Sequence, residues 1–441
     1  EYFNILLKDF KNPIENVELI LFAQCFEECL KENQIPQYNI FIKSCQDLIT
    51  RVVSSKDIKE TDRDQVVNLL HGHPKLLRQP EIVKTITQII QFQNEIGHNM
   101  RGILYLIADK GGKIPHEIIM ASISSLKNGD LHAGYMIERY ISHGYELPKG
   151  LLESLLLILK DRKSDALRLT VIIFKAIVRE GYDLPEAGIS FFIDILKNIQ
   201  SDEVLDPVAW VLCFITTRSK KSLDGEKILT EISQIVKSSK SYITKNFAVT
   251  VLKRVVQEDN RFAKEALQKL TQISKSREED RDTKIVTAIA LREIVAEKTR
   301  YAKEALNCLI ETMSYNEGSL RELRNISSKI LIESMEQIIQ ILYEPKYDSI
   351  FKGCACSIIK KIITESETIP EIAISGMTKV LKGDDYSPKA TAIAALKEVV
   401  QKRKSLPKET LEELKKITKM NPQEDIYDCI TSATFVLRQV E

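Results

Sequence analysis

The sequence predicts an all-α protein, a right-handed superhelix in which pairs of helices stack side by side. Large apolar residues recur every 31 to 39 residues, with a typical period near 37. Between one and the next lie two amphipathic stretches separated by a short polar break. A repeat of this length with two helices is the pattern of an α-solenoid. The recurring residues are Ile114, Leu147, Leu184, Leu223, Phe262, Tyr301, Ile338, Ile369 and Leu406.

Each recurring apolar residue is expected to open the first helix of a pair, called helix A, and the second helix is called helix B. In most copies a Pro or Ala follows directly, as at Pro115, Pro185 and Ala263. Pro suits the first turn of a helix, because its missing N–H would have no partner there and its fixed φ fits the helix. These positions therefore predict where the A helices start.

The chain divides into two parts in this interpretation. Residues 1–100 form a helical N-terminal part, and residues 101–441 form the repeat array. Pro74 and Pro80 break the region before residue 100 into short helices. A solenoid needs end repeats that cover its stacking surface, so we expect the N-terminal part to consist of diverged or capping repeats.

Over about residues 100–441, the unit resembles the HEAT and armadillo repeats. In that family, helix A opens near a Pro, and a short turn leads into an Ala-containing helix B. The segment Asp206-Pro207-Val208-Ala209 fits such a turn, as does Ser387-Pro388-Lys389-Ala390, before Ala392-Ile393-Ala394-Ala395-Leu396. The unit at 338–368 is short and matches poorly. The resemblance implies an α-solenoid whose B helices line the concave surface, and it implies nearly nothing about function.

The composition narrows the function classes. Charged residues make up 28% of the chain, yet the net charge is only +1, so no global attraction to nucleic acid or an anionic membrane is expected. There is no run of 18 apolar residues, so we expect no membrane span. The eight scattered Cys residues favour reduced thiols and an intracellular, cytoplasmic protein. The chain begins without Met, so a targeting signal could be missing from this fragment.

The strongest functional feature is a basic residue that stands nine residues before the opening of an A helix. We call these residues the basic ladder, and they are Lys175, Lys253, Arg292, Lys329, Lys360 and Lys397. Glu138 and Phe214 occupy the same position in two other copies. Apolar neighbours such as Val255 and Val399 should face the core, so the ladder should face solvent. Because stacked repeats align equivalent positions, we expect one basic stripe along the B helices.

This stripe predicts a non-catalytic scaffold that binds a protein partner, acidic or phosphorylated, on its concave helix-B surface. A solvated face with local ion pairs fits the same pattern, since Glu293 and Glu398 directly follow ladder residues. One alternative is an RNA- or nucleic-acid-binding repeat protein, because residues 118–148 resemble a pentatricopeptide repeat. That pattern is not maintained after residue 185. A second alternative is the regulatory or recognition arm of a larger enzyme.

No catalytic, cofactor or metal site is predicted. The GxSxG, P-loop, HExxH and GxGxxG patterns are all absent from the sequence. Cys25, Cys29, His71 and His73 could surround a zinc ion, but zinc ligands usually come in tighter pairs, so we favour core cysteines and a surface loop. The remaining candidates have ordinary interpretations as well: Trp210 as a core residue, and His116, His132 and His143 as surface or capping residues.

Overall fold

The protein is helical throughout the part of the chain that its computed structural model describes. The described residues are 16–28, 38–56, 58–161, 164–218, 222–276, 278–313, 316–344, 347–403, 405–420 and 427–440. They contain no β-strand, so the all-α prediction is confirmed for them. They separate into two compact units, residues 1–215 and 216–441, each described below by itself.

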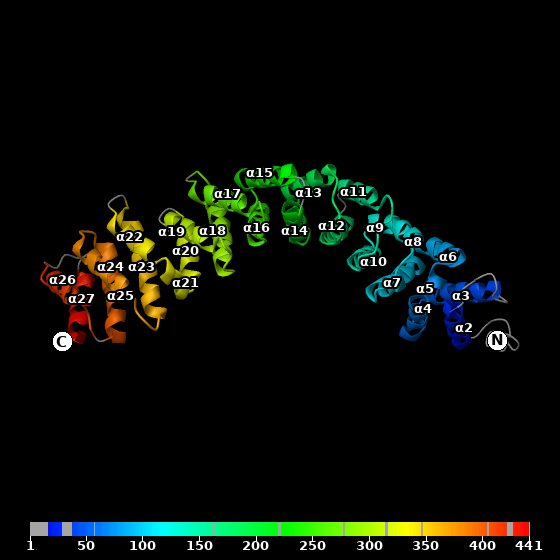
Figure 1. Ribbon diagram of the computed structural model, residues 1–441, viewed down its shortest axis with the longest axis horizontal. Helices are drawn as coiled ribbons and strands as arrows, with labels where there is room; N and C mark the ends of the chain where they lie inside the picture. Colours follow the sequence, from blue (N-terminus) through cyan, green and yellow to red (C-terminus); the bar gives the residue numbers. More distant parts are fainter. Residues whose placement is uncertain are drawn as a thin grey trace. The chain divides into compact units, whose positions relative to one another are not determined.

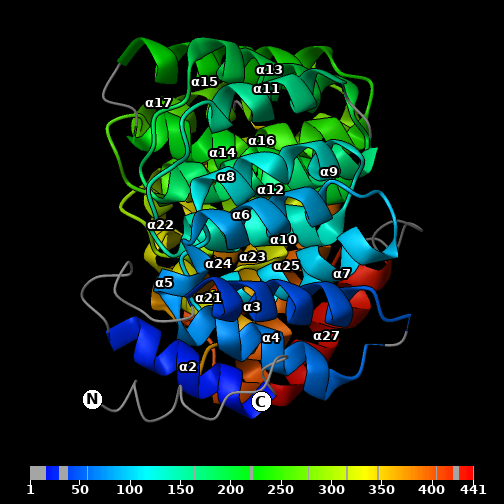
Figure 2. The ribbon, with the colours of Figure 1, turned by 90° about the vertical axis from the view of Figure 1, so that its right-hand side faces the viewer.

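Unit 1 consists of two layers of helices (Figure 1). One layer holds the A helices α3 (Tyr38–Val53), α6 (Pro80–Ile90), α8 (His116–Ala121), α9 (Ile123–Lys127), α11 (Leu151–Asp161) and α13 (Glu186–Asn198). The other holds the B helices α4 (Glu60–Gly72), α7 (Glu95–Asp109), α10 (Leu131–Ser142), α12 (Ser164–Arg179) and α14 (Asp202–Arg218). Helix α2 (Asn16–Glu28) precedes the first pair, and the short α5 (Pro74–Leu77) lies between α4 and α6. Figure 2 shows α3, α6 and α8 side by side in the A layer.

Unit 2 repeats the arrangement. Its A helices are α15 (Ser222–Ser238), α17 (Ala263–Lys275), α19 (Ala302–Thr312), α22 (Met335–Tyr343), α24 (Glu371–Lys382) and α26 (Lys408–Ile417). Its B helices are α16 (Tyr242–Gln257), α18 (Arg281–Ala296), α20 (Glu317–Asn325) with α21 (Ser328–Glu333), α23 (Ser349–Glu365), α25 (Tyr386–Arg403) and α27 (Tyr427–Val440). Each B helix contacts the A helix of its own pair and the neighbouring B helices.

In four copies the A helix begins one residue after the Pro that follows the recurring apolar residue. Pro115, Pro185, Pro370 and Pro407 are N-cap residues, with the helix beginning at the next residue. The N-cap residue has non-helical ψ, and a Pro whose φ is already near −65° meets that requirement. In these copies the helix therefore begins one residue later than a Pro at the first helical position would require.

Three details of the predicted repeat were wrong. The segment Ser387-Pro388-Lys389-Ala390, predicted as a turn before helix B, lies inside α25, which begins at Tyr386. Pro207 lies inside α14 and not in the turn before it, so its missing N–H removes one backbone hydrogen bond early in that helix. The irregular unit is also displaced, because α22 starts at Met335, before the predicted opening at Ile338. The interruption falls instead between α20 and α21, at Ile326 and Ser327.

The predicted boundary between residues 1–100 and 101–441 falls inside α7, which runs from Glu95 to Asp109. The chain divides into its two compact units between Ile215 and Thr216. Helices on both sides of residue 100 pack in the same two layers of unit 1. The description of residues 1–100 as diverged or capping repeats stays a prediction, and residues 1–15 lie outside the described part of the chain.

The turns after the B helices use two kinds of residue. In unit 1, α10 and α12 are followed by Gly144 and Gly181, whose φ angles of 73° and 89° suit glycine. In unit 2, the corresponding left-handed residues after α16 and α18 are Asp259 and Lys298, with φ angles of 48° and 53°. Residues other than glycine rarely adopt this backbone conformation.

The core of each unit lies between adjacent helices. The B-helix residues expected to be buried, Leu252, Val255, Leu291, Ile294, Leu396 and Val399, are all 0% exposed. We expect Leu291→Ala to lower the free energy of unfolding by about 2–5 kcal/mol, because it deletes packed methyl groups and leaves a cavity. Urea unfolding followed by circular dichroism measures the change.

Leu157 provides the matched control, because its side chain is 68% exposed in α11. Leu157→Ala removes the same atoms from a site where they contact mainly water, so its effect should stay within about 0.5 kcal/mol. Equal losses for the two variants would contradict the assigned helix phase.

Candidate functional site

Most of the basic ladder lies where the sequence placed it. Lys175 is in α12 of unit 1, and Lys253, Arg292, Lys360 and Lys397 are in α16, α18, α23 and α25 of unit 2. Each is half-buried and directly follows a buried residue of its helix. The apolar side of every B helix therefore faces the core, and the ladder side chains reach the surface along its edge.

Lys329 differs from the rest of the ladder. The long B helix expected around it is divided, because α20 ends at Asn325 and Lys329 falls in the first turn of the six-residue α21. Its side chain is exposed, whereas the other ladder side chains are half-buried. The expectation that Lys329 occupies the same turn as its counterparts is therefore wrong.

Two ladder cations form ion pairs with the next repeat. The Nζ atom of Lys253 lies 2.5 Å from Oε2 of Glu293, on the neighbouring B helix. The Nε atom of Arg292 donates to Oε2 of Glu322 at 2.7 Å, and the Glu322 side chain is only 6% exposed. Partly buried, charge-assisted hydrogen bonds of this kind are stronger than exposed ion pairs.

Two other ladder cations lie over aromatic rings of the next repeat. Lys175 Nζ is 5.0 Å from the centroid of the Trp210 ring on α14. Trp210 in turn stacks on Phe214, with ring centroids 3.7 Å apart. In unit 2, Lys397 Nζ lies 4.4 Å from the centroid of the Phe435 ring on α27. A cation over an aromatic face contributes about 0.5–1 kcal/mol at exposed sites.

Trp210 does not belong to the core, contrary to the prediction. It is half-buried on the surface of α14, next to a similarly half-buried Phe214. Phe214 occupies the position that Lys or Arg takes elsewhere in the ladder. That substitution was visible in the sequence and could have indicated that aromatic residues replace cations on this face.

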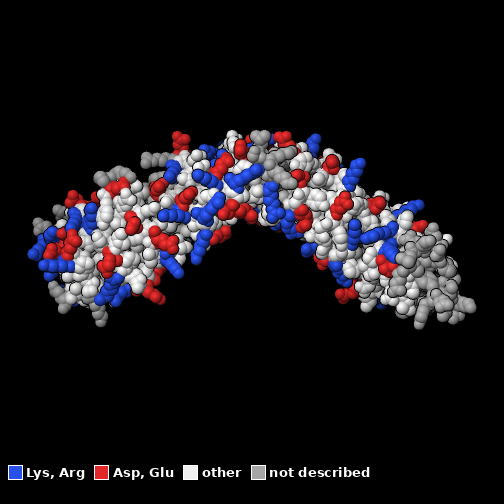
Figure 3. Space-filling model, in the orientation of Figure 1, with Lys and Arg blue, Asp and Glu red and all other residues white. Residues whose placement is uncertain are grey.

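Lys360 has no recorded ion pair or ring contact among the described residues. The ladder is thus not a row of free cations. Four of its members connect a B helix to the next one, through contacts that we call inter-repeat contacts: Lys175–Trp210, Lys253–Glu293, Arg292–Glu322 and Lys397–Phe435. Figure 3 agrees, because blue and red side chains are interspersed over the face shown.

Two buried ion pairs outside the ladder also connect neighbouring repeats, and they were not identified from the sequence. Arg101 in α7 is 3% exposed, and its Nε lies 2.9 Å from Oδ2 of Asp130, the N-cap residue of α10. Lys245 in α16, also 3% exposed, pairs with Asp280, the N-cap residue of α18. Each carboxylate thus caps its own helix and holds a cation from the preceding repeat. The only sequence feature that could have indicated these ion pairs is an Asp at the expected N-cap of each B helix.

The surroundings of Asp130 favour its charged form. Burial opposes ionisation, but the N–H of Ala133 and the guanidinium of Arg101 hold the pKa of Asp130 below its ordinary value. His98 Nδ1 lies 3.3 Å from the same carboxylate, and the His98 and His132 rings are 4.6 Å apart. These residues form one polar cluster between α7 and α10.

Other classes of site find no support among the described residues. No three His, Cys, Asp or Glu side chains there come close enough together to hold a metal ion, and Cys29 of the considered zinc set lies outside this part of the chain. Burial raises the pKa of the Cys356 thiol to about 12, which makes it a poor nucleophile. Within the same residues, every helix is too short or too polar to traverse a bilayer.

The comparisons with known proteins identify the fold. The karyopherin Kap121p, in a crystal structure bound to the extreme C-terminus of the protein phosphatase Cdc14p, matches with a TM-score of 0.51 and 14% sequence identity. The match covers 99% of this chain and 50% of the karyopherin, so the chain spans about half of that protein's length. The fold is an α-solenoid of the HEAT and armadillo type, as predicted.

Other solved structures are more distant. Yeast importin-beta (Kap95p) matches with a TM-score of 0.40 and 11% identity, over 99% of this chain and 61% of its own. An engineered protein is 14% identical, with a TM-score of 0.31, over 97% of this chain and 99% of its own. No protein-family model matches the sequence, and no curated protein matches it either.

The Arg292–Glu322 contact leads to a prediction about stability. We expect Arg292→Met to cost about 1–3 kcal/mol of unfolding free energy, because it leaves the buried Glu322 carboxylate without its main partner. Adding Glu322→Gln should restore part of that loss, since no buried charge then remains. Chemical denaturation of the single and double variants measures both effects. Lys360→Met is the control, and a loss as large as that of Arg292→Met would contradict the argument.

The His132 environment predicts a pH dependence. Burial, followed by the nearby His98 and Arg101, lowers the pKa of His132 below 6.5, while Asp130 acts in the opposite direction. On acidification, the unfolded chain therefore takes up the proton first. The stability present above about pH 6.5 is lost as the pH falls through the lower pKa of the folded state.

We expect the melting temperature to fall between about pH 7.5 and 5.5, and to fall less in His132→Gln. Burial also lowers the pKa of His73, so part of the slope should remain in that variant. His143→Gln, a change at an exposed histidine, is the control. An identical slope in wild type and His132→Gln would show that His132 does not titrate differently in the two states.

Proposed function

We propose that this chain is a non-catalytic protein–protein interaction scaffold that binds its partner on the B-helix face. The observation that carries the proposal is the set of aromatic side chains left accessible there. Trp210 and Phe214 are half-buried in unit 1, and Phe435 is 41% exposed in unit 2. Trp is among the residues that most often dominate the binding energy of protein interfaces, and Phe is enriched in such interfaces.

The basic ladder supports an acidic or phosphorylated partner. Lys329 and Lys360 carry charges without recorded ion pairs, and Lys175 and Lys397 lie over rings that leave their charge uncompensated. Lys253 and Arg292 are held by carboxylates, so they should contribute less. All six ladder residues remain in the proposed surface, with Lys329 and Lys360 as the strongest candidates.

The likeness to Kap121p is compatible with this proposal, because that protein's structure holds a terminal segment of another protein. Nucleic-acid binding is less well supported, since a phosphate backbone favours many uncompensated cations, and here Glu293 and Glu322 neutralise part of the ladder. A role as the arm of a larger enzyme stays an open alternative. A cytoplasmic location, compatible with free thiols at Cys45 and Cys356, completes the proposal.

The test reverses the two uncompensated cations. We expect Lys329→Glu/Lys360→Glu to reduce or abolish the capture of partner proteins from a native lysate, because an acidic surface would then be repelled. Quantitative mass spectrometry of proteins bound to wild type and variant measures the change. This pair leaves every inter-repeat contact in place, so the fold should survive.

Lys264→Glu/Lys303→Glu supplies the matched control, since it reverses two exposed cations on the A helices α17 and α19. Equal losses for the two double variants would point to a general charge effect and would count against the B-helix face. Capture unchanged in Lys329→Glu/Lys360→Glu would refute the assigned surface. If a captured partner binds only through RNA, ribonuclease treatment before capture will remove it and favour the nucleic-acid alternative.

A further inference from the structure

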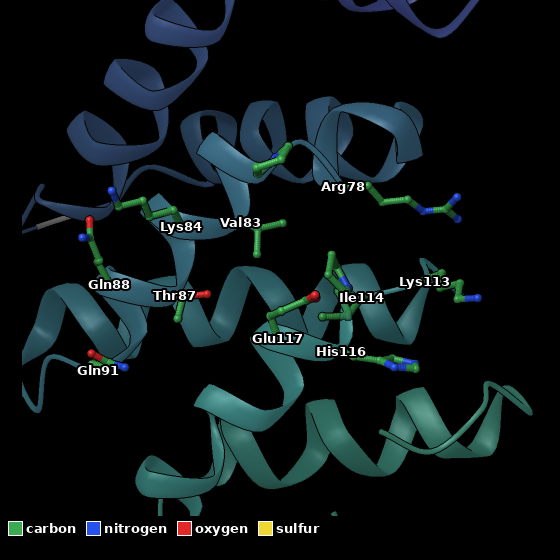
Figure 4. A pocket seen from close by; sticks show the side chains of 12 residues that line it. Arg78, Val83, Lys84, Thr87, Gln88, Gln91, Lys113, Ile114, His116 and Glu117 are labelled. Atoms are coloured by element: carbon green, nitrogen blue, oxygen red, sulfur yellow. The ribbon is translucent and has the colours of Figure 1, made fainter. Parts of the chain in front are cut away.

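A groove runs between the A helices α6 and α8 of unit 1, on the layer opposite the B-helix face. Its volume is about 710 Å³, within the range of sites that bind small ligands or a few peptide residues. Val83, Ile114 and Pro115 line its apolar part. Figure 4 shows the side chains of Arg78 and Lys113 at one end of the groove and that of Lys84 toward the other.

The charges around this groove differ from those on the B-helix face. Arg78, Lys84 and Lys113 are exposed, and no ion pair is recorded for any of them among the described residues. Lys113 contacts only a ring, with its Nζ 5.8 Å from the centroid of Tyr145. Glu117 is the one carboxylate that lines the groove in the described part of the chain. The groove therefore combines an apolar floor with an excess of uncompensated positive charge.

The local sequence explains this excess. Arg78 stands just before α6, and Lys113 stands just before α8, so both precede the start of neighbouring A helices. Lys84 lies one turn into α6, on the side that faces the groove. Elsewhere in unit 1, some cations form ion pairs with an acidic residue of the next repeat, as Arg101 does with Asp130 and Lys127 with Asp161. Among the described residues, no carboxylate takes that role for Arg78, Lys84 or Lys113.

We propose that the groove binds a short acidic segment of a partner protein, with one apolar side chain seated against Val83 and Pro115. Its carboxylates would lie near Arg78 and Lys113 at one end and near Lys84 at the other. The exposed amides of Gln88 and Gln91, which also line the groove, can hydrogen-bond to the segment's backbone. This second surface does not depend on the partner bound at the B-helix face.

The dimensions and chemistry favour a peptide over a nucleic acid. A bound nucleic-acid backbone calls for a track of cations, and single-stranded sites usually add accessible aromatic rings on which bases stack. The groove has aliphatic side chains and prolines on its floor, and His116 is the only ring among its lining residues other than the prolines. An apolar anchor between acidic residues matches this arrangement in both charge and shape.

The test uses the whole chain and a fluorescein-labelled peptide of sequence Glu-Asp-Glu-Leu-Asp-Glu. Fluorescence anisotropy measures its affinity for wild type and for Arg78→Glu/Lys113→Glu, for which we expect binding weaker by about tenfold or more. Lys110→Glu/Lys149→Glu, which reverses two exposed cations outside the groove, should bind within about twofold of wild type. Equal binding by the two double variants would overturn the proposal.

A second comparison tests the apolar anchor. Replacing Leu by Ser in the peptide should weaken binding to wild type, whereas Val83→Ser protein should bind both peptides alike, because the contact is already lost. An undiminished preference for Leu in Val83→Ser would refute the assigned seat. So would tight binding of labelled oligouridylate with no binding of the acidic peptide. Lys329→Glu/Lys360→Glu should leave peptide binding unchanged, so this test fails or succeeds independently of the B-helix proposal.

Discussion

Within each unit, the packing of each B helix against the next is the interaction on which the rest of the structure depends. In α16 and α18, buried side chains recur at helical spacing, as Leu252 with Val255 and Leu291 with Ile294 show. A single helix pair cannot cover this apolar side by itself, so every repeat relies on its neighbour. This requirement determines which side of each B helix is buried. The ladder residues then lie beside the buried side, where their side chains reach the surface.

The same requirement explains how much could be predicted. Apolar spacing encodes which side of a helix is buried, so the fold class and the core positions could be derived from the sequence. Trp210 was misplaced because Val208, Ala209, Val211 and Leu212 surround it, and in such a run helical spacing distinguishes the two sides poorly. The break before Lys329 was missed because no Gly or Pro marks it, only Ile326 and Ser327.

The partners of the ladder residues could not be predicted for a different reason. Lys253 pairs with a residue 40 positions later, and Arg292 with one 30 positions later. The separation varies because the intervening loops and helices differ in length, and one sequence gives no means to register one B helix against the next. In the sequence, a stripe of free cations and a set of paired cations therefore look alike.

Asp259 after α16 and Lys298 after α18 both have left-handed backbone conformations, but replacing them with glycine should affect stability differently. A non-glycine residue in this conformation carries about 1–2 kcal/mol of strain, while glycine costs about 0.5–1 kcal/mol in chain entropy, so exchange for glycine leaves a small net gain. At the exposed Lys298, no recorded side-chain contact offsets that gain. At Asp259, glycine would also remove the carboxylate that lies 2.5 Å from Nε of Arg300, and with it much of the advantage.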